Sequence, residues 1–328
     1  MKYLVTGGAG FIGSHLVEHL LSNGHEVVVL DNLSTGKMEN LSNVVDNEKF
    51  TFVNVDLTNW NELTKQFSYF KQCSGVFHLA AFARIQPSIY DPMHCMNINV
   101  QGTLHVLEMM RMTGCDKIVY SASSSRYGLA NNPPFKEWMH SDCLNPYSAS
   151  KYQSEVLCKT WGKMYGIKNV SLVYFNVFGD RSPLNIGAYS PVVSLFYAQA
   201  LRDNKNLTVV GDGKQSRDFT YVLDVAVANL KAMQNLETSA TANGQSINIG
   251  TGKSIMIVDL AKKVKESINT IQKMKISIKH IDSRLAECRH VNADITLAKQ
   301  LIDWEPITTL DVALDHLKFV YLKQFERK

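Results

Sequence analysis

Tyr147 and Lys151 have the clearest capacity for acid–base chemistry in this 328-residue chain. Asn145 and Pro146 stand just before them and predict a helix start, because asparagine caps helices and proline suits the first helical position. Four residues apart, the phenol and the ammonium lie one turn from each other. A tyrosine that acts as a base near neutral pH needs its pKa lowered from about 10 by roughly 3 units, about 4 kcal/mol. Lys151 and the positive end of the helix would contribute to that shift.

Serines upstream of this pair strengthen the interpretation. Taken alone, a tyrosine and a lysine at this spacing are also typical of an exposed helix pair. Here a predicted strand at 117–121 ends in the run Ser121-Ala122-Ser123-Ser124-Ser125. Parallel sheets present functional residues at the carboxyl ends of their strands, so we expect this run to hydrogen-bond a substrate hydroxyl.

A glycine-rich turn near the start of the chain predicts a second kind of site. An apolar strand at 2–6 leads into Gly7-Gly8-Ala9-Gly10-Phe11-Ile12-Gly13, and a helix is predicted at 12–22. Glycines let the backbone turn sharply toward a pyrophosphate, and the N–H groups of the helix then face that anion. The ordered context of strand, turn, helix and second strand favours a ligand site over an ordinary turn. The turn therefore predicts dinucleotide binding.

Asp31 indicates which dinucleotide binds. It directly follows the second apolar strand, where a carboxylate accepts hydrogen bonds from both ribose hydroxyls. Its charge would repel a 2'-phosphate, and no arginine lies beside it in the sequence. We therefore expect NAD rather than NADP as the cofactor.

The elements that position these residues alternate along the first half of the chain. Strands are predicted at 2–6, 26–30, 51–55, 75–80, 117–121 and 170–175, and helices at 12–22, 59–70, 93–112 and 147–165. Alternation of this kind means a parallel sheet, and strands this uniformly apolar are covered on both faces. The predicted fold class is α/β, a Rossmann-type doubly wound parallel sheet with a smaller α/β C-terminal substrate domain.

The pattern changes after about residue 176. Turn clusters follow at 179–183 and 211–213, and further helices are predicted at 224–235, 256–269 and 309–324. We expect a dinucleotide-binding domain at 1–175 and a mainly substrate-binding domain at 176–328, with some segments of the second returning to the first. No repeat or linker is evident, so the two are expected to pack around one cleft.

Composition excludes several other classes of protein. The six cysteines lack CxxC spacing and histidine partners, so neither a disulfide framework nor a metal site is expected. The formal charge of +4 is small, and the lysine-rich stretch 262–279 lacks the aromatic side chains of a nucleic-acid site. No apolar run approaches the ~20 residues that cross a bilayer. We expect a cytoplasmic protein with reduced thiols and with neither a nucleic acid nor a membrane as partner.

Together these motifs resemble the extended short-chain dehydrogenase/reductase family, and within it the nucleotide-sugar epimerases and dehydratases. The resemblance covers nearly the whole chain. Its pieces are Thr6-Gly7-Gly8-Ala9-Gly10-Phe11-Ile12-Gly13, Asp31-Asn32-Leu33, Val55-Asp56-Leu57, His78-Leu79-Ala80-Ala81, Asn99-Val100-x-Gly102-Thr103, Ser123-x-x-x-Tyr127-Gly128, Tyr147-x-x-x-Lys151, Tyr174-Phe175-Asn176-Val177-Phe178-Gly179, Arg217-Asp218-Phe219 and Arg284-x-x-Glu287.

The resemblance implies a catalytic set and a cofactor site. Ser123, Tyr147 and Lys151 would form the catalytic set, with Lys151 also bonding the nicotinamide ribose. The glycine motif and the resemblance together give the residues expected at NAD: Gly7, Gly10, Phe11, Ile12, Gly13, Asp31, Asn32, Asp56, Leu57, Leu79, Ala80, Ala81, Asn99, Ser121, Tyr147 and Lys151.

For the substrate, the resemblance implies that Asn176, Arg217 and Arg284 hold the diphosphate of a UDP-sugar, in keeping with the bidentate bonds that arginine makes to phosphate. The side chains expected at the sugar are Ser123, Ser124, Ser125, Tyr147 and Val291. Val291 stands seven residues after Arg284, where a bulky tyrosine in the family is associated with exclusion of N-acetylated sugars. A valine there predicts that such sugars fit.

The serine run also bears on the reaction. In the family's 4,6-dehydratases, Asp and Glu stand at the positions of Ser124 and Ser125 and move protons that hydroxyls cannot. The family's decarboxylases keep a glutamate that this chain lacks. The expected activity is therefore NAD-dependent 4-epimerisation of UDP-hexoses, through transient oxidation at C4: UDP-glucose with UDP-galactose, and UDP-N-acetylglucosamine with its galacto epimer.

Other readings stay open. The chain could instead be a UDP-glucuronate 4-epimerase, a 4,6-dehydratase, a decarboxylase or a non-catalytic NAD-binding protein. Arg126, Val173 and Ala83 depart from the family pattern, and they affect expected sugar contacts rather than the catalytic set. The helices at 93–112 and 147–165 carry apolar residues at helical spacing, and the resemblance implies that they form the interface of a homodimer.

Overall fold

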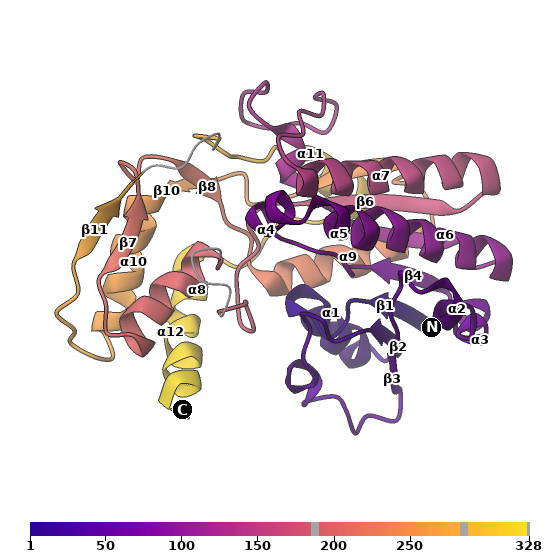
Figure 1. The fold of residues 1–328 in the computed structure, drawn as a ribbon, viewed down its shortest axis with the longest axis horizontal. Coiled ribbons are helices and arrows are strands. Elements are labelled where there is room, and N and C mark those ends of the chain that lie inside the picture. The colour runs from indigo at the N-terminus through magenta and orange to yellow at the C-terminus, as the bar shows by residue number, and fades with distance from the viewer. Residues whose placement is uncertain (185–189, 283–287, 327–328) are drawn as a thin grey trace.

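A computed structural model describes residues 1–184, 190–282 and 288–326. A larger part is built on one sheet, and a smaller part lies beside it with the C-terminal helix (Figure 1). The larger part holds β1 (Lys2–Thr6), β2 (Glu26–Asp31), β3 (Phe50–Asn54), β4 (Gly75–His78), β5 (Lys117–Ser123), β6 (Lys168–Tyr174) and β9 (Gln245–Ile249).

These seven strands form one parallel sheet in the order β3-β2-β1-β4-β5-β6-β9. The chain builds outward from β1 to β3 and then returns to place β4 on the other side of β1. Ligands of such sheets bind at the carboxyl ends of the strands, where the order reverses. This topology confirms the predicted Rossmann-type α/β fold and places the candidate site at the ends of β1 and β4.

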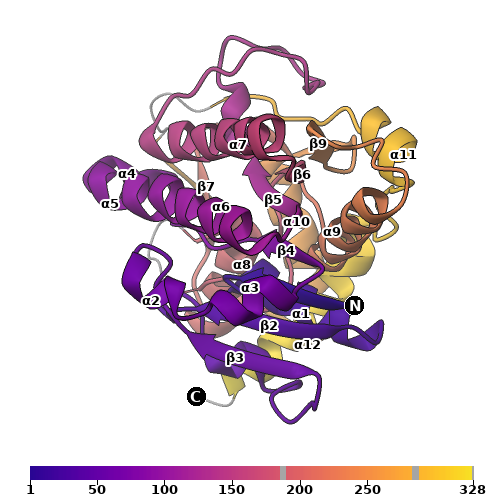
Figure 2. The same cartoon turned by 90° about the vertical axis from the view of Figure 1, so that its right-hand side faces the viewer.

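Helices cover both faces of the sheet, as Figure 2 shows. One face packs on α1 (Phe11–Ser22), α9 (Val222–Glu237) and α11 (Thr296–Ile302). The other packs on α3 (Phe67–Gln72), α6 (Gly102–Thr113) and α7 (Pro146–Tyr165). Side chains alternate along a strand, so β5 sends Val119 to the first core and Ile118 to the second. Burial on both faces explains why these strands are apolar at successive positions.

The smaller part has a core of its own. It combines β7 (Leu207–Val210) paired with β11 (Ile278–Ile281), and β8 (Ser216–Asp218) paired with β10 (Ser254–Met256). Its helices are α8 (Val192–Tyr197), α10 (Ile257–Asn269) and α12 (Leu310–Glu326). Because α9, β9 and α11 belong to the large sheet layer, segments after residue 176 contribute to both parts. The domain boundary at 175/176 stays a prediction.

Two predicted elements need correction, and other elements were not predicted. The helix expected at 59–70 is two short helices, α2 (Trp60–Thr64) and α3, each of which buries a single apolar side chain. The segment expected as one helix at 93–112 consists of α5 (Pro92–Met96), a π-helical turn at Asn97–Gln101 and α6. Strand β9 and helix α4 (Ile85–Tyr90) were not predicted, because short runs with few apolar residues lack a clear period.

Two negative findings concern the described residues only. Within 1–184, 190–282 and 288–326, no helix is long and apolar enough to cross a membrane. Over the same ranges, no three His, Cys, Asp or Glu side chains gather in a group that could hold a metal ion. All six cysteines are free thiols.

The turn after β1 needs its glycines for packing. Gly7 has φ +69°, and a Cβ there would lie 2.6 Å from the backbone nitrogen of Ala80 in the loop after β4. A Cβ on Gly13 would lie 2.2 Å from the carbonyl oxygen of Gly7. The absence of side chains therefore lets helix α1 and the β4 loop approach the turn closely.

We predict that Gly13→Ala destabilises the protein by about 2 kcal/mol or more, because the new methyl group clashes with backbone that cannot move aside. Gly102→Ala, in the first turn of α6, is the matched control, since its Cβ would meet its nearest atom at 3.7 Å. Urea unfolding of both variants checks this. Equal stabilities would contradict the steric argument.

Candidate active site

The amino end of α1 is the first component of the site. Gly10 is its N-cap, and no described side chain makes a capping hydrogen bond there. Phe11 and Ile12 open the helix and are partly exposed. The first N–H groups of this 12-residue helix are therefore available to an anion. This arrangement fits the pyrophosphate of a dinucleotide.

Asp31 lies at the end of β2, beside that turn. Its Oδ2 accepts a hydrogen bond from the Ala9 N–H at 3.0 Å, and its Oδ1 accepts one from the Leu33 N–H at 2.8 Å. Burial raises the pKa of this carboxyl, and the two backbone donors act in the opposite direction. Each oxygen keeps a further lone pair, so the carboxylate can still accept from ribose hydroxyls. The donor and acceptor set fits NAD.

The side chains of Asn32, which follows β2, and Asp56, which follows the neighbouring strand β3, lie together. The Asn32 amide donates to Asp56 Oδ2 at 3.1 Å, and Thr58 donates to Oδ1 through its N–H and its hydroxyl. Burial raises the pKa of Asp56, but these hydrogen bonds outweigh burial, so the pKa is lowered overall. Leu57 is buried next to it. The structure thus brings together the side chains predicted near the adenosine.

Asn99 is inside the protein and fixes two other elements. Its Oδ1 accepts from the Phe82 N–H at 2.7 Å, and its Nδ2 donates to Ser150 Oγ on α7 at 2.8 Å. The π-helical turn at 97–101 places this side chain, in keeping with the location of such turns at functional sites. Through these bonds Asn99 holds the loop containing Leu79, Ala80 and Ala81 against α7.

Tyr147 lies in the first turn of α7, next to Ser123 at the end of β5. Asn145 caps the helix by accepting from the Ser148 N–H at 2.9 Å, in a reciprocal capping box. Burial is the largest effect and raises the pKa of Tyr147 above its ordinary value, although the neighbouring Ser123 side chain and the Arg84 guanidinium act in the opposite direction. The lowered pKa expected from the sequence is therefore not found in the folded chain, but the predicted tyrosine and serine are neighbours.

Lys151 follows one turn later and is 5% exposed. Its ammonium lies 4.5 Å from the centre of the Tyr120 ring, a cation–π contact. Burial lowers the pKa of Lys151 to about 7. Among the described residues it has no carboxylate partner, so its charge is available to a bound group.

The other serines have distinct positions. Ser123 and Ser125 share a hydrogen bond of 2.9 Å between their hydroxyls. Ser124 is the first residue of a 3-10 turn that ends at Tyr127. Ser121 instead hydrogen-bonds the Tyr174 hydroxyl at 3.0 Å in the interior. The hydroxyls of Ser123 and Ser125 thus lie together, whereas that of Ser121 is engaged by β6.

A buried ion pair ties this serine turn to α7. Arg126 Nη1 donates to both oxygens of Glu155, at 2.6 and 2.9 Å, and Glu155 also accepts from Ser246 at 2.6 Å and Lys159 at 2.9 Å. Arg126 also stacks over the ring of Tyr152 at 4.9 Å. The Nε of Arg126 is buried without a partner, but the bonds from its Nη1 to Glu155 favour one relative position of the two elements. The departure at Arg126 therefore has a structural role beside the catalytic set.

Arg84 was missed by the sequence analysis. It lies in the loop after β4, three residues beyond Ala81, and it is the positive group that lowers the pKa of Tyr147. The signal available in the sequence was only its place directly after a predicted cofactor segment. The lowering was instead attributed to Lys151 and the helix end.

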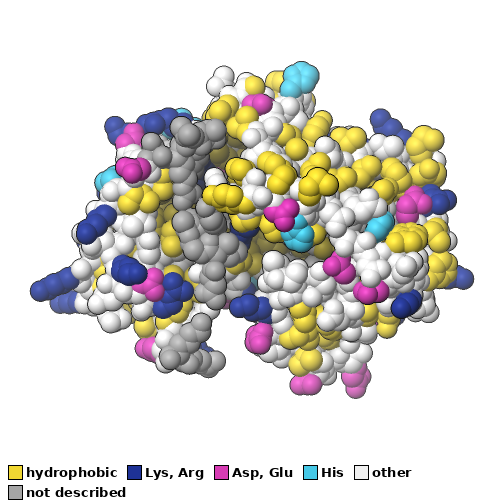
Figure 3. Space-filling view, in the orientation of Figure 1, with side chains coloured by type: hydrophobic (Ala, Val, Ile, Leu, Met, Phe, Trp, Pro, Cys, Tyr) yellow, Lys and Arg dark blue, Asp and Glu magenta, His cyan; other side chains and the backbone are white. Residues whose placement is uncertain are grey.

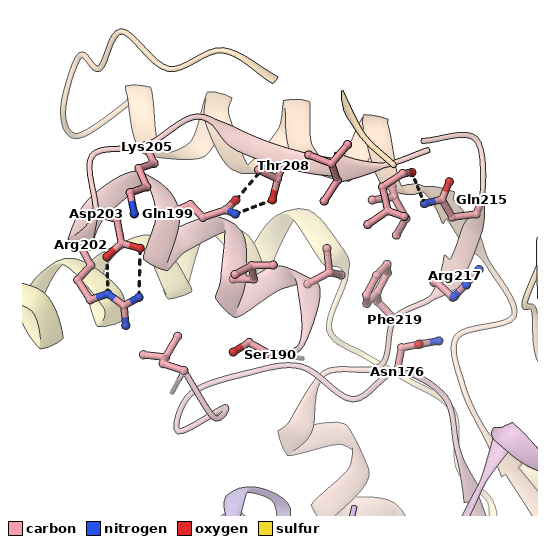
Figure 4. A pocket seen from close by; sticks show the side chains of 16 residues that line it. Asn176, Ser190, Gln199, Arg202, Asp203, Lys205, Thr208, Gln215, Arg217 and Phe219 are labelled. Carbon is pink, nitrogen blue, oxygen red and sulfur yellow. Dashed lines mark hydrogen bonds and ion pairs between the residues drawn. The ribbon is translucent and has the colours of Figure 1, made fainter. Parts of the chain in front are cut away.

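The predicted diphosphate residues lie in the smaller part. The molecule is hollowed between its two parts (Figure 3). Asn176 and Arg217 line a cavity of about 630 Å³, together with Phe219. The Asn176 amide donates to the Asp218 carbonyl at 2.9 Å. Figure 4 shows Asn176, Arg217 and Phe219 at one end of this cavity and the Arg202–Asp203 ion pair at the other.

Two further residues were predicted at the substrate. Arg284 lies outside the described residues. Val291 is buried in the core that contains Phe175 and Ala293, and its N–H donates to the Ser216 carbonyl at 3.1 Å. The residues lining the cavity of Figure 4 come from described segments and include neither Tyr147 nor Val291.

Comparisons with known proteins match nearly the whole chain. The sequence profile described as GDP-mannose 4,6 dehydratase matches residues 4–317. A putative UDP-glucose 4-epimerase of Methanocaldococcus jannaschii is 37% identical over 304 residues, 92% of each chain.

Solved structures are similar over the same extent. The UDP-N-acetylglucosamine 4-epimerase of Methanobrevibacter ruminantium, in complex with UDP-N-acetylmuramic acid, has a TM-score of 0.90 at 32% identity and 98% coverage of both chains. The UDP-glucuronic acid 4-epimerase of Bacillus cereus, in complex with UDP-glucuronic acid and NAD, has a TM-score of 0.87 at 31% identity and 99% coverage of both chains.

Fold, motifs and relatives agree over almost all of the sequence. The chain therefore belongs to the extended short-chain dehydrogenase/reductase family, among its NAD-dependent nucleotide-sugar epimerases and dehydratases.

Proposed function

We propose that this protein is an NAD-dependent 4-epimerase of UDP-hexoses. The observation that carries the proposal is the contact of Tyr147 with Ser123, with the unpaired Lys151 ammonium one helical turn away. The named relatives that act on UDP-sugars as 4-epimerases support it. The hydroxyls of Ser124 and Ser125 support epimerisation over dehydration, because a hydroxyl of high pKa does not shuttle protons at C5 and C6.

Each catalytic side chain has a separate task. Ser123 orients the 4-hydroxyl of the sugar, and Tyr147 as phenolate takes its proton and later returns it. Lys151 stabilises the phenolate and bonds the nicotinamide ribose. NAD, when bound, supplies a hydride acceptor for C4 and the donor for its return. Because the 4-ketosugar can turn over before hydride returns, the product is the C4 epimer with no net redox change.

The remaining assignments follow from the same proposal. Asn176, Arg217 and Arg284 hold the UDP diphosphate, and the residues predicted around Asp31 hold the adenosine half of NAD. Exposed apolar side chains on α6 and α7, among them Met112 and Val156, support a homodimer through these two helices. Free thiols at all six cysteines support a cytoplasmic location.

Product analysis tests the proposed function directly. Incubation of the purified protein with UDP-glucose and with UDP-N-acetylglucosamine should give the C4 epimer of each sugar without added NAD. A 4-keto-6-deoxy sugar would instead assign a dehydratase, and recovery of the substrates alone would remove epimerisation.

Tyr147→Phe should lower kcat by about 100- to 10,000-fold, the usual contribution of a general base. Only a hydroxyl is lost, so the NAD content of the purified protein should stay the same. Tyr165→Phe, at an exposed position of the same helix, is the control. Turnover assays and release of bound nucleotide measure both effects, and a fully active Tyr147→Phe enzyme would refute the role.

The buried Lys151 predicts an unusual pH dependence of stability. Its pKa is about 7 in the folded chain, against an ordinary value of 10.5 for a lysine in water. Between these values the unfolded chain binds more protons, so the wild type gains stability as the pH rises. Relative to Lys151→Met, we expect a gain of about 2 to 3 kcal/mol between pH 7 and 9.5.

Urea unfolding at the two pH values, without added nucleotide, measures this difference. Lys163→Met, exposed on the same helix, is the control and should show a much smaller change. A difference between wild type and Lys151→Met that stays constant with pH would show that Lys151 is charged in the folded chain throughout this range.

Val291 is proposed to leave room for an N-acetyl group. Val291→Tyr should therefore lower kcat/KM for UDP-N-acetylglucosamine about 10-fold or more relative to UDP-glucose, because added bulk excludes the larger sugar. Val291→Ala should keep the ratio. An unchanged ratio in the tyrosine variant, measured with folded protein, would contradict the proposal.

A further inference from the structure

Arg84 lies at the reactive end of the site. It is the N-cap of α4, in the loop that leaves β4. Ser88, four residues on, accepts a hydrogen bond at 3.1 Å from the Tyr147 N–H at the start of α7. This hydrogen bond holds α4 against the start of α7, and Arg84 stands at the N-terminal end of α4.

The guanidinium of Arg84 is poorly satisfied by the protein. Its Nη1 donates at 3.0 Å to the carbonyl of the neighbouring Ala83, and its Nε is buried without a hydrogen-bond partner. No described carboxylate pairs with it. A buried cation without an anion is unfavourable, and a planar guanidinium is suited to grip a carboxylate with two parallel bonds.

The charge of Arg84 and the phenol of Tyr147 influence each other's pKa. The Arg84 guanidinium lowers the pKa of Tyr147, and Tyr147 in turn opposes the lowering of the Arg84 pKa by burial. A charged substituent on a sugar bound at Tyr147 would therefore interact electrostatically with the Arg84 guanidinium.

The other anions of the complex have different sites. The predicted pyrophosphate of NAD faces the amino end of α1. The predicted diphosphate of UDP lies at Asn176 and Arg217 in the smaller part. The sugar is therefore the part of the substrate that could carry an anion for Arg84 to bind.

We propose that Arg84 binds a carboxylate of the substrate sugar, so that the preferred substrates are acidic UDP-sugars. The inference rests on the proposed function and narrows its substrate class. Two relatives have been solved with carboxylate-bearing ligands, UDP-N-acetylmuramic acid and UDP-glucuronic acid, which supports an acidic substrate. The carboxylate is either on C6 of the hexose or on a substituent of the ring.

The experiment compares each acid with its neutral counterpart. One arm uses UDP-glucuronate and UDP-glucose, for a carboxylate on C6. The other uses UDP-N-acetylmuramate and UDP-N-acetylglucosamine, for a carboxylate on a substituent. For each pair, kcat/KM and equilibrium binding are measured with wild type, Arg84→Gln, Arg84→Lys and the control Lys299→Gln, which removes one exposed positive charge from α11.

In wild type, one of the two acids should be preferred over its neutral counterpart. In Arg84→Gln, the acid-to-neutral ratio of that pair should fall about 30- to 100-fold, both in kcat/KM and in binding, as expected for loss of a charge-assisted contact. Arg84→Lys should restore part of the ratio, because it keeps the charge without the fork. Lys299→Gln should leave the ratio as in wild type.

Failure of this inference differs from failure of the proposed function. Equal loss with acid and neutral sugars in Arg84→Gln would overturn the inference and assign Arg84 to the electrostatics of Tyr147. Wild type that epimerises only neutral sugars would also overturn it, with the proposed function intact. If none of the four sugars is epimerised, the proposed function fails, and the binding ratio still decides whether Arg84 recognises the carboxylate.

Discussion

Positive charge buried beside a phenol is the constraint on which this site depends. Lys151 is 5% exposed, and the Nε of Arg84 is buried without a partner. Neither cation has a carboxylate partner among the described residues. Removing such charges from water is unfavourable unless another charge compensates them. Both favour an anionic ligand next to them, and Arg84 also opposes the rise that burial causes in the pKa of Tyr147.

The surrounding structure has to hold these cations in place. The start of α7 is fixed by the Asn145 capping box, and Asn99 ties the helix to the loop after β4 through Ser150. Farther along α7, Glu155 joins Arg126 of the serine turn. These networks position the elements that carry Ser123, Tyr147 and Lys151. Guanidinium nitrogens buried without a partner occur at Arg84 and also at Arg126 and Arg181.

Much of this could be predicted from the sequence, for identifiable reasons. The fold followed from the alternation of apolar strands with helices, because strands buried on both faces are apolar at successive positions. The contact between Ser123 and Tyr147 followed from a strand end and a helix cap. Strand β9 was not predicted, because its few apolar residues give no clear period. The division of residues 59–70 into two helices was not predicted either, because both short helices lie within one apolar pattern.

Electrostatics was less predictable than position. The sequence placed Lys151 one turn from Tyr147 and so suggested that it lowers the tyrosine pKa. In the folded chain burial raises the tyrosine pKa, and the positive group that opposes this rise is Arg84, which is distant in sequence. Burial is a property of the assembled fold, so neither the depressed pKa of Lys151 nor the unpartnered Nε of Arg84 was visible in residue spacing.

In the proposed mechanism, chemistry and substrate choice come from different elements of this fold. Ser123, Tyr147 and Lys151 belong to β5 and α7, at the centre of the large sheet. Arg84 belongs to a short helix after β4, and Asn176 and Arg217 belong to the smaller part. A change in α4 or in the smaller part can alter which sugar fits while the cap of α7 and its buried network stay as they are. Relatives of 31 to 37% identity that are named for different UDP-sugars agree with this separation.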